Sequence, residues 1–517
     1  MISIPVSTRP ARPKSEARAR SEPSYELWTV LAVLTLLYVA AVLGAHRRFV
    51  WFDELYTLDL AKATTIPQIW QLIRRFDFQP PALYLLSHFS MKLFGQSPFG
   101  LRLPSMLEFY VGSMALFFFV RRKVGISYAA AAVLLLWLGA PFQYATEARP
   151  YALLLMSFST LLLCWDLATT SENRRLALWG VAISNLVMLS AHVFAPLSLF
   201  PFLAAEWVRF SRTRRADFAL WAALLVPTVA MILYIPLLKG YGALYFPPAF
   251  QASMGKIVYF YFGCISIVSV ALLVAVCAAL IVPQEKPRIA SARGWRPEEM
   301  VLLGLILLNP ILLNIVLNLR HGAFWDRYAI TTRAVIYIGM AVLLGLRLAR
   351  NRYAGYAAAA VLLVFCVRTD VWQNLSTPTV KNASALADVR SDLPLVDAGA
   401  VTFFEMNHYE KPDILSRLYF LKDRSVAMSY THTNFFEDQG WGGDAMKPYF
   451  PISASVSSYT DFVQQHREFL VLGTYDAPEE WLLRKLHDDG ARLTWLGAFP
   501  LPYVDSNLYL VSLTAAK

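Results

Sequence analysis

About eleven apolar segments divide residues 27–367 of this 517-residue chain, and no other feature constrains its fold as strongly. The first, Leu27–Ala45, approaches the roughly 20 residues that a helix needs to cross the hydrocarbon of a bilayer. Hydrophobic residues make up 57% of the chain and charged residues only 16%, so it is too apolar for a soluble protein. The sequence therefore predicts a polytopic α-helical membrane protein. The other segments lie near residues 104–120, 127–144, 151–169, 176–191, 193–208, 217–238, 257–282, 299–319, 330–346 and 354–367.

The placement of basic residues predicts the orientation of these spans. The tail 1–26 is basic and precedes a run that is long for a cleaved signal peptide, which favours an uncleaved signal anchor. Connectors on the side of this tail hold more Lys and Arg than the opposite connectors, so the tail is expected in the cytoplasm and the C-terminus outside. The net charge of +11 is then mainly a topology signal and gives no support to nucleic-acid binding.

Two regions are expected outside the membrane. The first outer loop, residues 46–103, is long and rich in aromatic residues, which predicts an ordered loop, with a helix at the outer interface over Pro80–Gly95. Residues 368–517 predict a small periplasmic α/β domain. Its expected elements are strands at Ala400–Met406, Phe469–Thr474, Leu493–Phe499 and Asn507–Leu513, and a helix at Pro478–Asp489 that Gly490 closes.

Ionisable residues gather in the connectors that this topology places at the outer face. Each is unremarkable alone: Asp53 and Glu54 could be solvated acids of an aromatic belt, Glu147 and Arg149 a surface ion pair, and the arginines could contact lipid headgroups. Together, however, a carboxylate base beside an arginine clamp suits group transfer from a lipid phosphate. The residues are Asp53, Glu54, Glu147, Arg149, His192, Arg320, Arg327 and Tyr328.

Several motifs in the same order resemble the GT-C glycosyltransferases that use polyprenyl-phosphate sugars. The resemblance covers about residues 27–346 and is strongest to the branch of protein O-mannosyltransferases and the bacterial aminoarabinose transferase. It implies a GT-C-like transmembrane domain over 27–367 and a periplasmic domain over 368–517. The motifs are FDE after the first span, QPPALYLLSHFSMKLFG followed by LRLPSML, EARPYALLL and WDRYAI.

The resemblance also implies roles for individual residues. Asp53 would be the catalytic base with Glu54 assisting it, and Glu147 would be a second acid near the active site. Arg327 and Tyr328 would hold the donor phosphate, together with Arg149. Gln79 stands where His before Pro-Pro is common, and Glu108 is left open between a further site acid and a structural group. The other cavity residues would be Tyr84, Tyr151, His192 and Arg320.

The expected function is sugar transfer in a bacterial inner membrane, with the active site facing the periplasm. The partners are then the lipid bilayer, a polyprenyl-phosphate-linked sugar and an acceptor lipid, glycan or protein. No metal-ligand spacing occurs beyond Asp53–Glu54, so a divalent cation is left open as a cofactor. The four cysteines lie in apolar stretches without CxxC spacing. A membrane transporter or lipid flippase, or a membrane-anchored binding module, are the alternatives.

Overall fold

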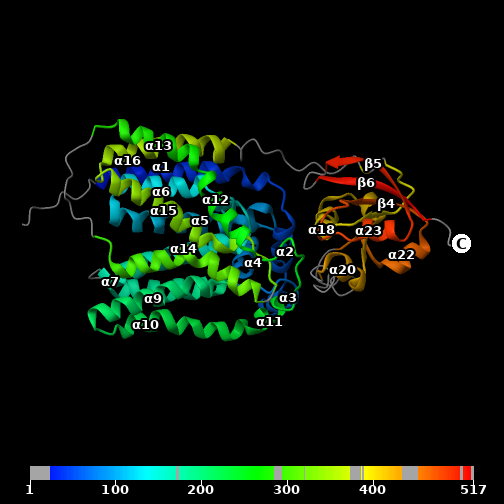
Figure 1. Cartoon of the computed structure of the whole chain (residues 1–517), viewed down its shortest axis with the longest axis horizontal. Coiled ribbons are helices and arrows are strands. Elements are labelled where there is room, and N and C mark those ends of the chain that lie inside the picture. Colours follow the sequence, from blue (N-terminus) through cyan, green and yellow to red (C-terminus); the bar gives the residue numbers. More distant parts are fainter. Residues whose placement is uncertain are drawn as a thin grey trace, which may run out of the picture.

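The computed structural model describes residues 24–170, 174–283, 294–319, 321–372, 386, 389–433, 452–500 and 505–513. It consists of a bundle of long helices and a smaller domain built on a β-sheet, with the helices of the first outer loop between them (Figure 1). Nearly all of the predicted cytoplasmic tail 1–26 lies outside the described residues, since the first helix begins at Ser24.

Each of the eleven predicted apolar segments is helical. Seven helices in the described part of the chain are long and apolar enough to cross a membrane, or nine if each of two bent pairs is one span. Helices α8 and α9 fall short of that standard, although α8 packs along α7 and α9 along α14. A polytopic helical protein is therefore confirmed, and the total of about eleven spans stays a prediction. The helices are α1 (Ser24–Val42), α5 (Pro98–Val124), α6 (Ile126–Leu138), α7 (Pro150–Thr170), α8 (Arg174–Ala191), α9 (Ala195–Thr213), α10 (Phe218–Leu225), η3 (Val226–Tyr234), α11 (Ile235–Tyr241), α12 (Met254–Ser266), α13 (Ser269–Ile281), α14 (Pro297–Asn318), α15 (Ile330–Arg347) and α16 (Arg352–Cys366).

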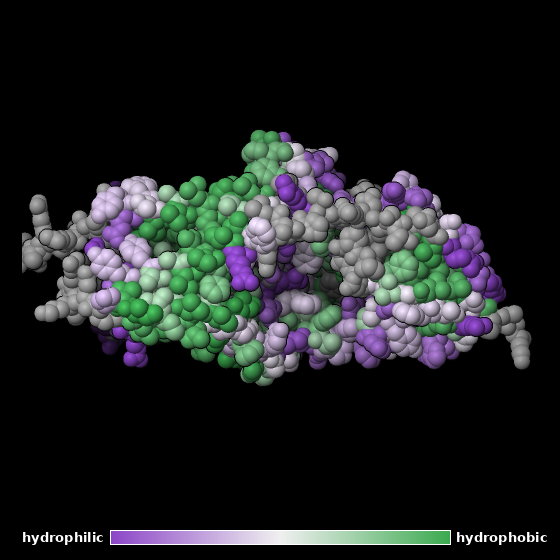
Figure 2. All heavy atoms as spheres, turned by 90° about the horizontal axis from the view of Figure 1, so that it is seen from above, coloured by the Kyte–Doolittle hydropathy of each residue, from purple (hydrophilic) through white to green (hydrophobic). Residues whose placement is uncertain are grey.

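The lateral surface of the helical bundle is apolar, as a surface that contacts lipid must be. Figure 2 shows hydrophobic residues covering the flank of the helical part, with hydrophilic residues towards its ends. Leu176, Phe218 and Ile281 are 77%, 74% and 83% exposed. In water such a continuous apolar surface would drive association, whereas in a bilayer it contacts lipid.

The first outer loop is ordered, as predicted, and folds into three short helices. They are α2 (Phe52–Ala61), α3 (Ile66–Phe76) and α4 (Ala82–Phe94). Thr65 caps α3 by accepting a hydrogen bond from the backbone N–H of Gln68. Helix α4 confirms the helix expected over Pro80–Gly95, and α5 begins at Pro98, within the predicted loop 46–103.

The C-terminal domain has a six-stranded sheet in the order β3-β2-β1-β4-β6-β5. Strand β1 is parallel to both neighbours, β2 and β4, while β6 is antiparallel to β4 and β5. The predicted strands at Phe469–Thr474, Leu493–Phe499 and Asn507–Leu513 are confirmed, and the predicted helix is present in its second half as α23. The bounds are β1 (Leu395–Asp397), β2 (Leu418–Lys422), β3 (Ser455–Ser458), β4 (Glu468–Gly473), β5 (Arg492–Pro500), β6 (Asp505–Ser512), α18 (Ala400–Tyr409), α19 (Pro412–Leu415), α20 (Arg424–Thr431), α22 (Tyr459–Gln465) and α23 (Leu482–Asp488).

The predicted strand at Ala400–Met406 is wrong, because this segment forms the first two turns of α18. The run has only two polar residues, Thr402 and Glu405, and a short, mostly apolar run does not distinguish a buried strand from a buried helix. Phe403 and Phe404 are both buried, but against different neighbours. Phe403 packs against Phe420 of the sheet, and Phe404 stacks on Tyr56 of α2. Helix α18 is therefore buried on more than one side, because it lies between the sheet and the first outer loop.

Candidate active site

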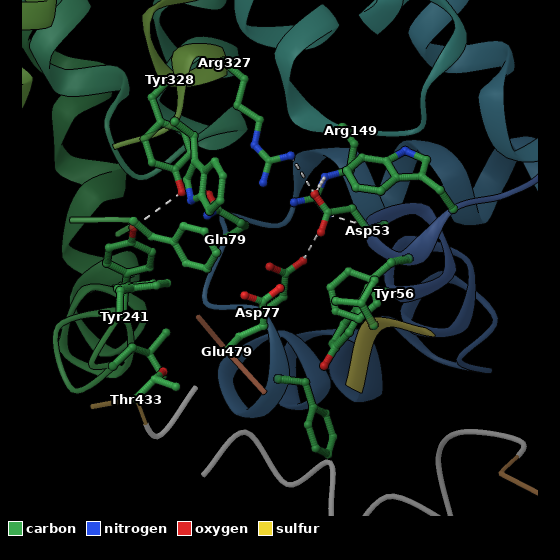
Figure 3. A pocket seen from close by; sticks show the side chains of 18 of the residues that line it. Asp53, Tyr56, Asp77, Gln79, Arg149, Tyr241, Arg327, Tyr328, Thr433 and Glu479 are labelled. Atoms are coloured by element: carbon green, nitrogen blue, oxygen red, sulfur yellow. Dashed lines mark hydrogen bonds and ion pairs between the residues drawn. The ribbon is translucent and has the colours of Figure 1, made fainter. Parts of the chain in front are cut away.

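A cavity of about 290 Å³ lies where the helical bundle, the first outer loop and the C-terminal domain meet (Figure 3). Aromatic rings form much of its wall, and its five charged side chains come from five separate chain segments. Its lining residues are Trp51, Phe52, Asp53, Tyr56, Phe76, Asp77, Gln79, Arg149, Tyr151, Tyr241, Leu244, Phe246, Pro247, Phe250, Trp325, Arg327, Tyr328, Val401, Thr433 and Glu479.

Asp53 stands between two arginines in this cavity. It lies in the first turn of α2, and its Oδ2 is 3.0 Å from Nη1 of Arg327 and 3.6 Å from Nε of Arg149. Nη1 of Arg149 also donates a hydrogen bond to the Asp53 backbone carbonyl at 3.0 Å. The Asp53 side chain remains 14% exposed, so its carboxylate is both fixed in place and accessible to a ligand in the cavity.

Asp77, which sequence reasoning missed, supplies a second carboxylate to the same cavity. Its Oδ2 is 3.8 Å from Nη1 of Arg149, and it accepts a hydrogen bond from the hydroxyl of Tyr84. Burial raises the pKa of Asp77, and the neighbouring Arg149 opposes that rise. The sequence signal that could have identified Asp77 is its position two residues before Gln79, where the Pro-Pro motif begins. Tyr84 is fully buried behind Asp77 and does not line the cavity.

Arg327 and Tyr328, the pair of the Arg-Tyr motif, both line this cavity. The Arg327 guanidinium stands over the rings of Trp51, Tyr151 and Trp325 at 5.9, 5.7 and 5.2 Å. Its Nε has no hydrogen-bond partner among the described residues. A guanidinium that is held by aromatic rings and keeps a free donor is suited to bind phosphate oxygens.

His192 packs behind this pair and does not line the cavity. Its ring is 5.1 Å from that of Tyr328 and 5.6 Å from that of Tyr151, and the residue is fully buried. Burial lowers the pKa of His192 to about 3, and Arg149 and Arg327 add to that effect. His192 is therefore neutral at physiological pH. Gln79 does line the cavity, where its Oε1 accepts a hydrogen bond from the backbone N–H of Val193 at 3.4 Å.

Glu54 is engaged differently from its neighbour Asp53. It is fully buried and accepts hydrogen bonds from Nε and Nη2 of Arg102 at 2.8 and 2.6 Å. It also accepts one from the backbone N–H of Ala148 at 2.8 Å. These contacts tie α2 to α5 and to the connector that carries Glu147 and Arg149, which is a positioning arrangement.

Glu147 lines a second cavity, of about 390 Å³, that shares Trp51, Arg327 and Val401 with the first. Burial and the nearby Glu54 raise the pKa of Glu147 to about 7. Glu108 is buried but lines neither of these cavities, and Arg320 lies outside the described residues. No group of three or more His, Cys, Asp or Glu in the described residues is placed to hold a metal ion.

The comparisons with known proteins agree with the class that the fold and site define. Residues 78–239, less than half of the chain, match the family model described as dolichyl-phosphate-mannose-protein mannosyltransferase. No significant match is found among curated proteins. Among solved structures, ArnT from Cupriavidus metallidurans is similar in the form bound to undecaprenyl phosphate (TM-score 0.51) and in the apo state (0.55). Each match covers 95% of this chain and 98% of that chain at 12% sequence identity.

At this identity the likeness to ArnT establishes the fold, and the family model adds the class of enzyme. This chain is a membrane glycosyltransferase with the GT-C fold and an additional C-terminal domain, which confirms the resemblance seen in its motifs. Neither finding supports the transporter or flippase alternative. The roles of the individual site residues stay predictions.

Proposed function

We propose that this chain is an inverting glycosyltransferase. It moves a sugar from a polyprenyl phosphate to a hydroxyl group of an acceptor lipid, glycan or protein at the periplasmic face of a bacterial inner membrane. The observation that carries the proposal is the Asp53 carboxylate, which stands between Arg149 and Arg327 on the wall of a cavity at one end of the helical bundle.

The geometry suits a single displacement at the anomeric carbon of the sugar. The acceptor hydroxyl gives its proton to Asp53 as its oxygen bonds to the anomeric carbon. The bond from that carbon to the phosphate oxygen breaks, and the polyprenyl phosphate leaves with the electron pair. Phosphate is a good leaving group, so one carboxylate suffices, unlike the pair that a typical glycosidase uses.

Arg327 and the adjacent tyrosines form the proposed site for the departing phosphate. The hydroxyls of Tyr328 and Tyr241 are 3.4 Å apart, and both residues line the cavity beside Arg327. Fixed donors of this kind stabilise charge that develops on the leaving group. A bound phosphate would compete with Asp53 for Arg327, whereas Arg149 holds the Asp53 backbone as well as its side chain. We therefore assign Arg327 mainly to the donor and Arg149 mainly to the base.

The remaining residues have supporting roles in this proposal. Glu54 fixes α2 through Arg102 instead of taking part in proton transfer. Glu147 is a second acid on the far side of Trp51 and Arg327, in the second cavity. Tyr151 and Gln79 line the main cavity, and His192 supports Tyr151 and Tyr328 from behind. Metal dependence is left to experiment, by assaying transfer with and without EDTA.

The test is a transfer assay with purified protein in detergent, a panel of undecaprenyl-phosphate sugars and an envelope extract as acceptor. Asp53→Asn should lower the rate by about 10²–10⁴-fold, the usual contribution of a general base, at a temperature at which the variant stays folded. Asp59→Asn is a matched control, because Asp59 lies on the same helix, pairs with Lys62 at 3.2 Å and does not line the cavity. Unimpaired transfer by Asp53→Asn would remove this residue from the base role.

A further inference from the structure

The sheet of the C-terminal domain faces the reaction cavity with the carboxyl ends of strands β1 and β4. Strands β1 and β4 are parallel neighbours, and β1 continues to β2 on its other side, so the strand order reverses between β1 and β4. In open α/β sheets, ligands bind outside the carboxyl ends of the strands at such a reversal. Val401 follows the carboxyl end of β1, Glu479 follows that of β4, and both line the cavity.

Glu479 is a charged residue at this edge of the sheet. Its Oε2 is inaccessible to solvent and has no hydrogen-bond partner among the described residues. In Figure 3 the carboxylates of Glu479 and Asp77 lie next to each other in the cavity, and that of Asp77 points toward Arg149, with which it pairs at 3.8 Å. A buried carboxylate oxygen that lacks a donor is costly, and a ligand that donates hydrogen bonds would remove that cost.

The domain is held against the membrane part by specific contacts, so Glu479 has a defined position. The backbone N–H of Phe52 donates to Oε1 of Glu405 at 2.8 Å, and the Thr433 hydroxyl donates to the Tyr245 carbonyl at 2.6 Å. The Tyr56 and Phe404 rings stack with centroids 5.4 Å apart. The domain and the first outer loop thus share one apolar core.

We propose that the C-terminal domain completes the subsite for the donor sugar, with Glu479 and Asp77 accepting hydrogen bonds from sugar hydroxyls. This inference rests on the proposed function. The two carboxylates repel phosphate, which belongs at Arg327, and the sugar is the next group along a polyprenyl-phosphate donor. Carboxylate acceptors beside aromatic faces, here Tyr56 and Phe246, suit a polyhydroxylated ring. The domain is then a determinant of sugar specificity.

Binding of lipids with and without a sugar tests this subsite in the full-length protein. The probes are undecaprenyl phosphate and its mannosyl, glucosyl and galactosyl derivatives, measured in detergent without acceptor. We expect wild-type protein to bind at least one sugar-bearing lipid more tightly than the bare lipid. Glu479→Ala should weaken that binding by about tenfold or more, as for a lost hydrogen bond to a charged group, and leave bare-lipid binding unchanged.

Asp476→Asn serves as the matched control, because Asp476 is an exposed acid of the same connector and does not line the cavity. Glu479→Gln keeps the side-chain shape and replaces Glu479→Ala if that variant folds poorly. It should weaken binding of the sugar-bearing lipid by a smaller factor. Equal losses for bare and sugar-bearing lipids, no loss, or a change confined to the acceptor KM would overturn the inference while the proposed function stands. Wild-type protein that binds none of these lipids and transfers no sugar would overturn both.

Discussion

The adjacent acids Asp53 and Glu54 should give opposite phenotypes when each is replaced by its amide. Glu54 is fully buried and balances the charge of Arg102, whose side chain is only 2% exposed. Removing one partner of a buried ion pair costs about 3–5 kcal/mol, because the other charge stays buried without compensation. Glutamine keeps one acceptor oxygen for Arg102. We therefore expect Glu54→Gln to lower the free energy of unfolding by an amount at the low end of this range, near 3 kcal/mol, or roughly a hundredfold in the folding equilibrium.

The assay follows tryptophan fluorescence during thermal unfolding in detergent, and sugar transfer at a temperature well below every unfolding midpoint. Glu54→Gln should unfold at a clearly lower temperature yet keep most of its transfer rate. Asp53→Asn should lose transfer, and it should lose less stability than Glu54→Gln because the Asp53 side chain is 14% exposed. A Glu54→Gln variant with unchanged stability and a rate as low as that of Asp53→Asn would refute the positioning role and return Glu54 to the chemistry.

A double-mutant cycle isolates the ion pair from the other contacts of Arg102. This guanidinium also donates to the backbone carbonyls of Arg48 and Phe49, so Arg102→Met loses more than the pair alone. If Glu54 and Arg102 stabilise each other directly, the double variant should lose less than the sum of the single variants, by about 1–3 kcal/mol. Additive losses would contradict the direct coupling seen at 2.6 and 2.8 Å.

Three further predictions follow from the cavity and its supports. Arg327→Ala should raise the donor KM by about tenfold or more, and Arg327→Lys by less; an unchanged KM in kinetic assays would exclude a phosphate contact. Glu405→Ala removes the acceptor for the Phe52 N–H at the start of α2, so kcat should fall with little change in donor KM, and Glu405→Gln should restore it. The raised pKa of Glu147, about 7, means that its stabilising contribution is full below its unfolded pKa and is lost as pH rises to about 7. Glu147→Gln should therefore gain melting temperature relative to wild type between about pH 5 and pH 8, and a constant difference would contradict the burial of this carboxyl group.

The sequence predicts the membrane part of the fold well because one physical rule governs it. A bilayer requires long apolar helices, and hydropathy reports them directly, so all eleven predicted segments are helical. In the C-terminal domain apolar runs are short, and the segment at Ala400–Met406 was misassigned because helix α18 is buried on several sides. Periodicity carries no information once every face of an element is covered.

The candidate site was predictable where its residues lie in contiguous motifs. Asp53, Arg149, Arg327 and Tyr328 line one cavity, as their outer connectors suggested. Ion pairs between residues far apart in the chain could not be predicted from the spacing of the motifs. Glu54 finds Arg102 on α5, and this pairing separates it from Asp53 although the two are consecutive.

In the part of the chain that the structure describes, both ends of the helical bundle bury charged side chains, but the two ends differ in how these charges are paired. At the predicted cytoplasmic end, Lys123 lies 3.3 Å from Asp166 and 2.7 Å from Glu299, and all three are buried. Every one of these groups has an oppositely charged partner, and such closed networks connect helices without offering a ligand anything to bind. The opposite end, roughly 40 Å away along α5, instead combines a cavity with side-chain atoms of Arg149, Arg327 and Glu479 that lack hydrogen-bond partners among the described residues. Burial of charge alone therefore does not locate chemistry in this protein, whereas incomplete pairing next to an open cavity does.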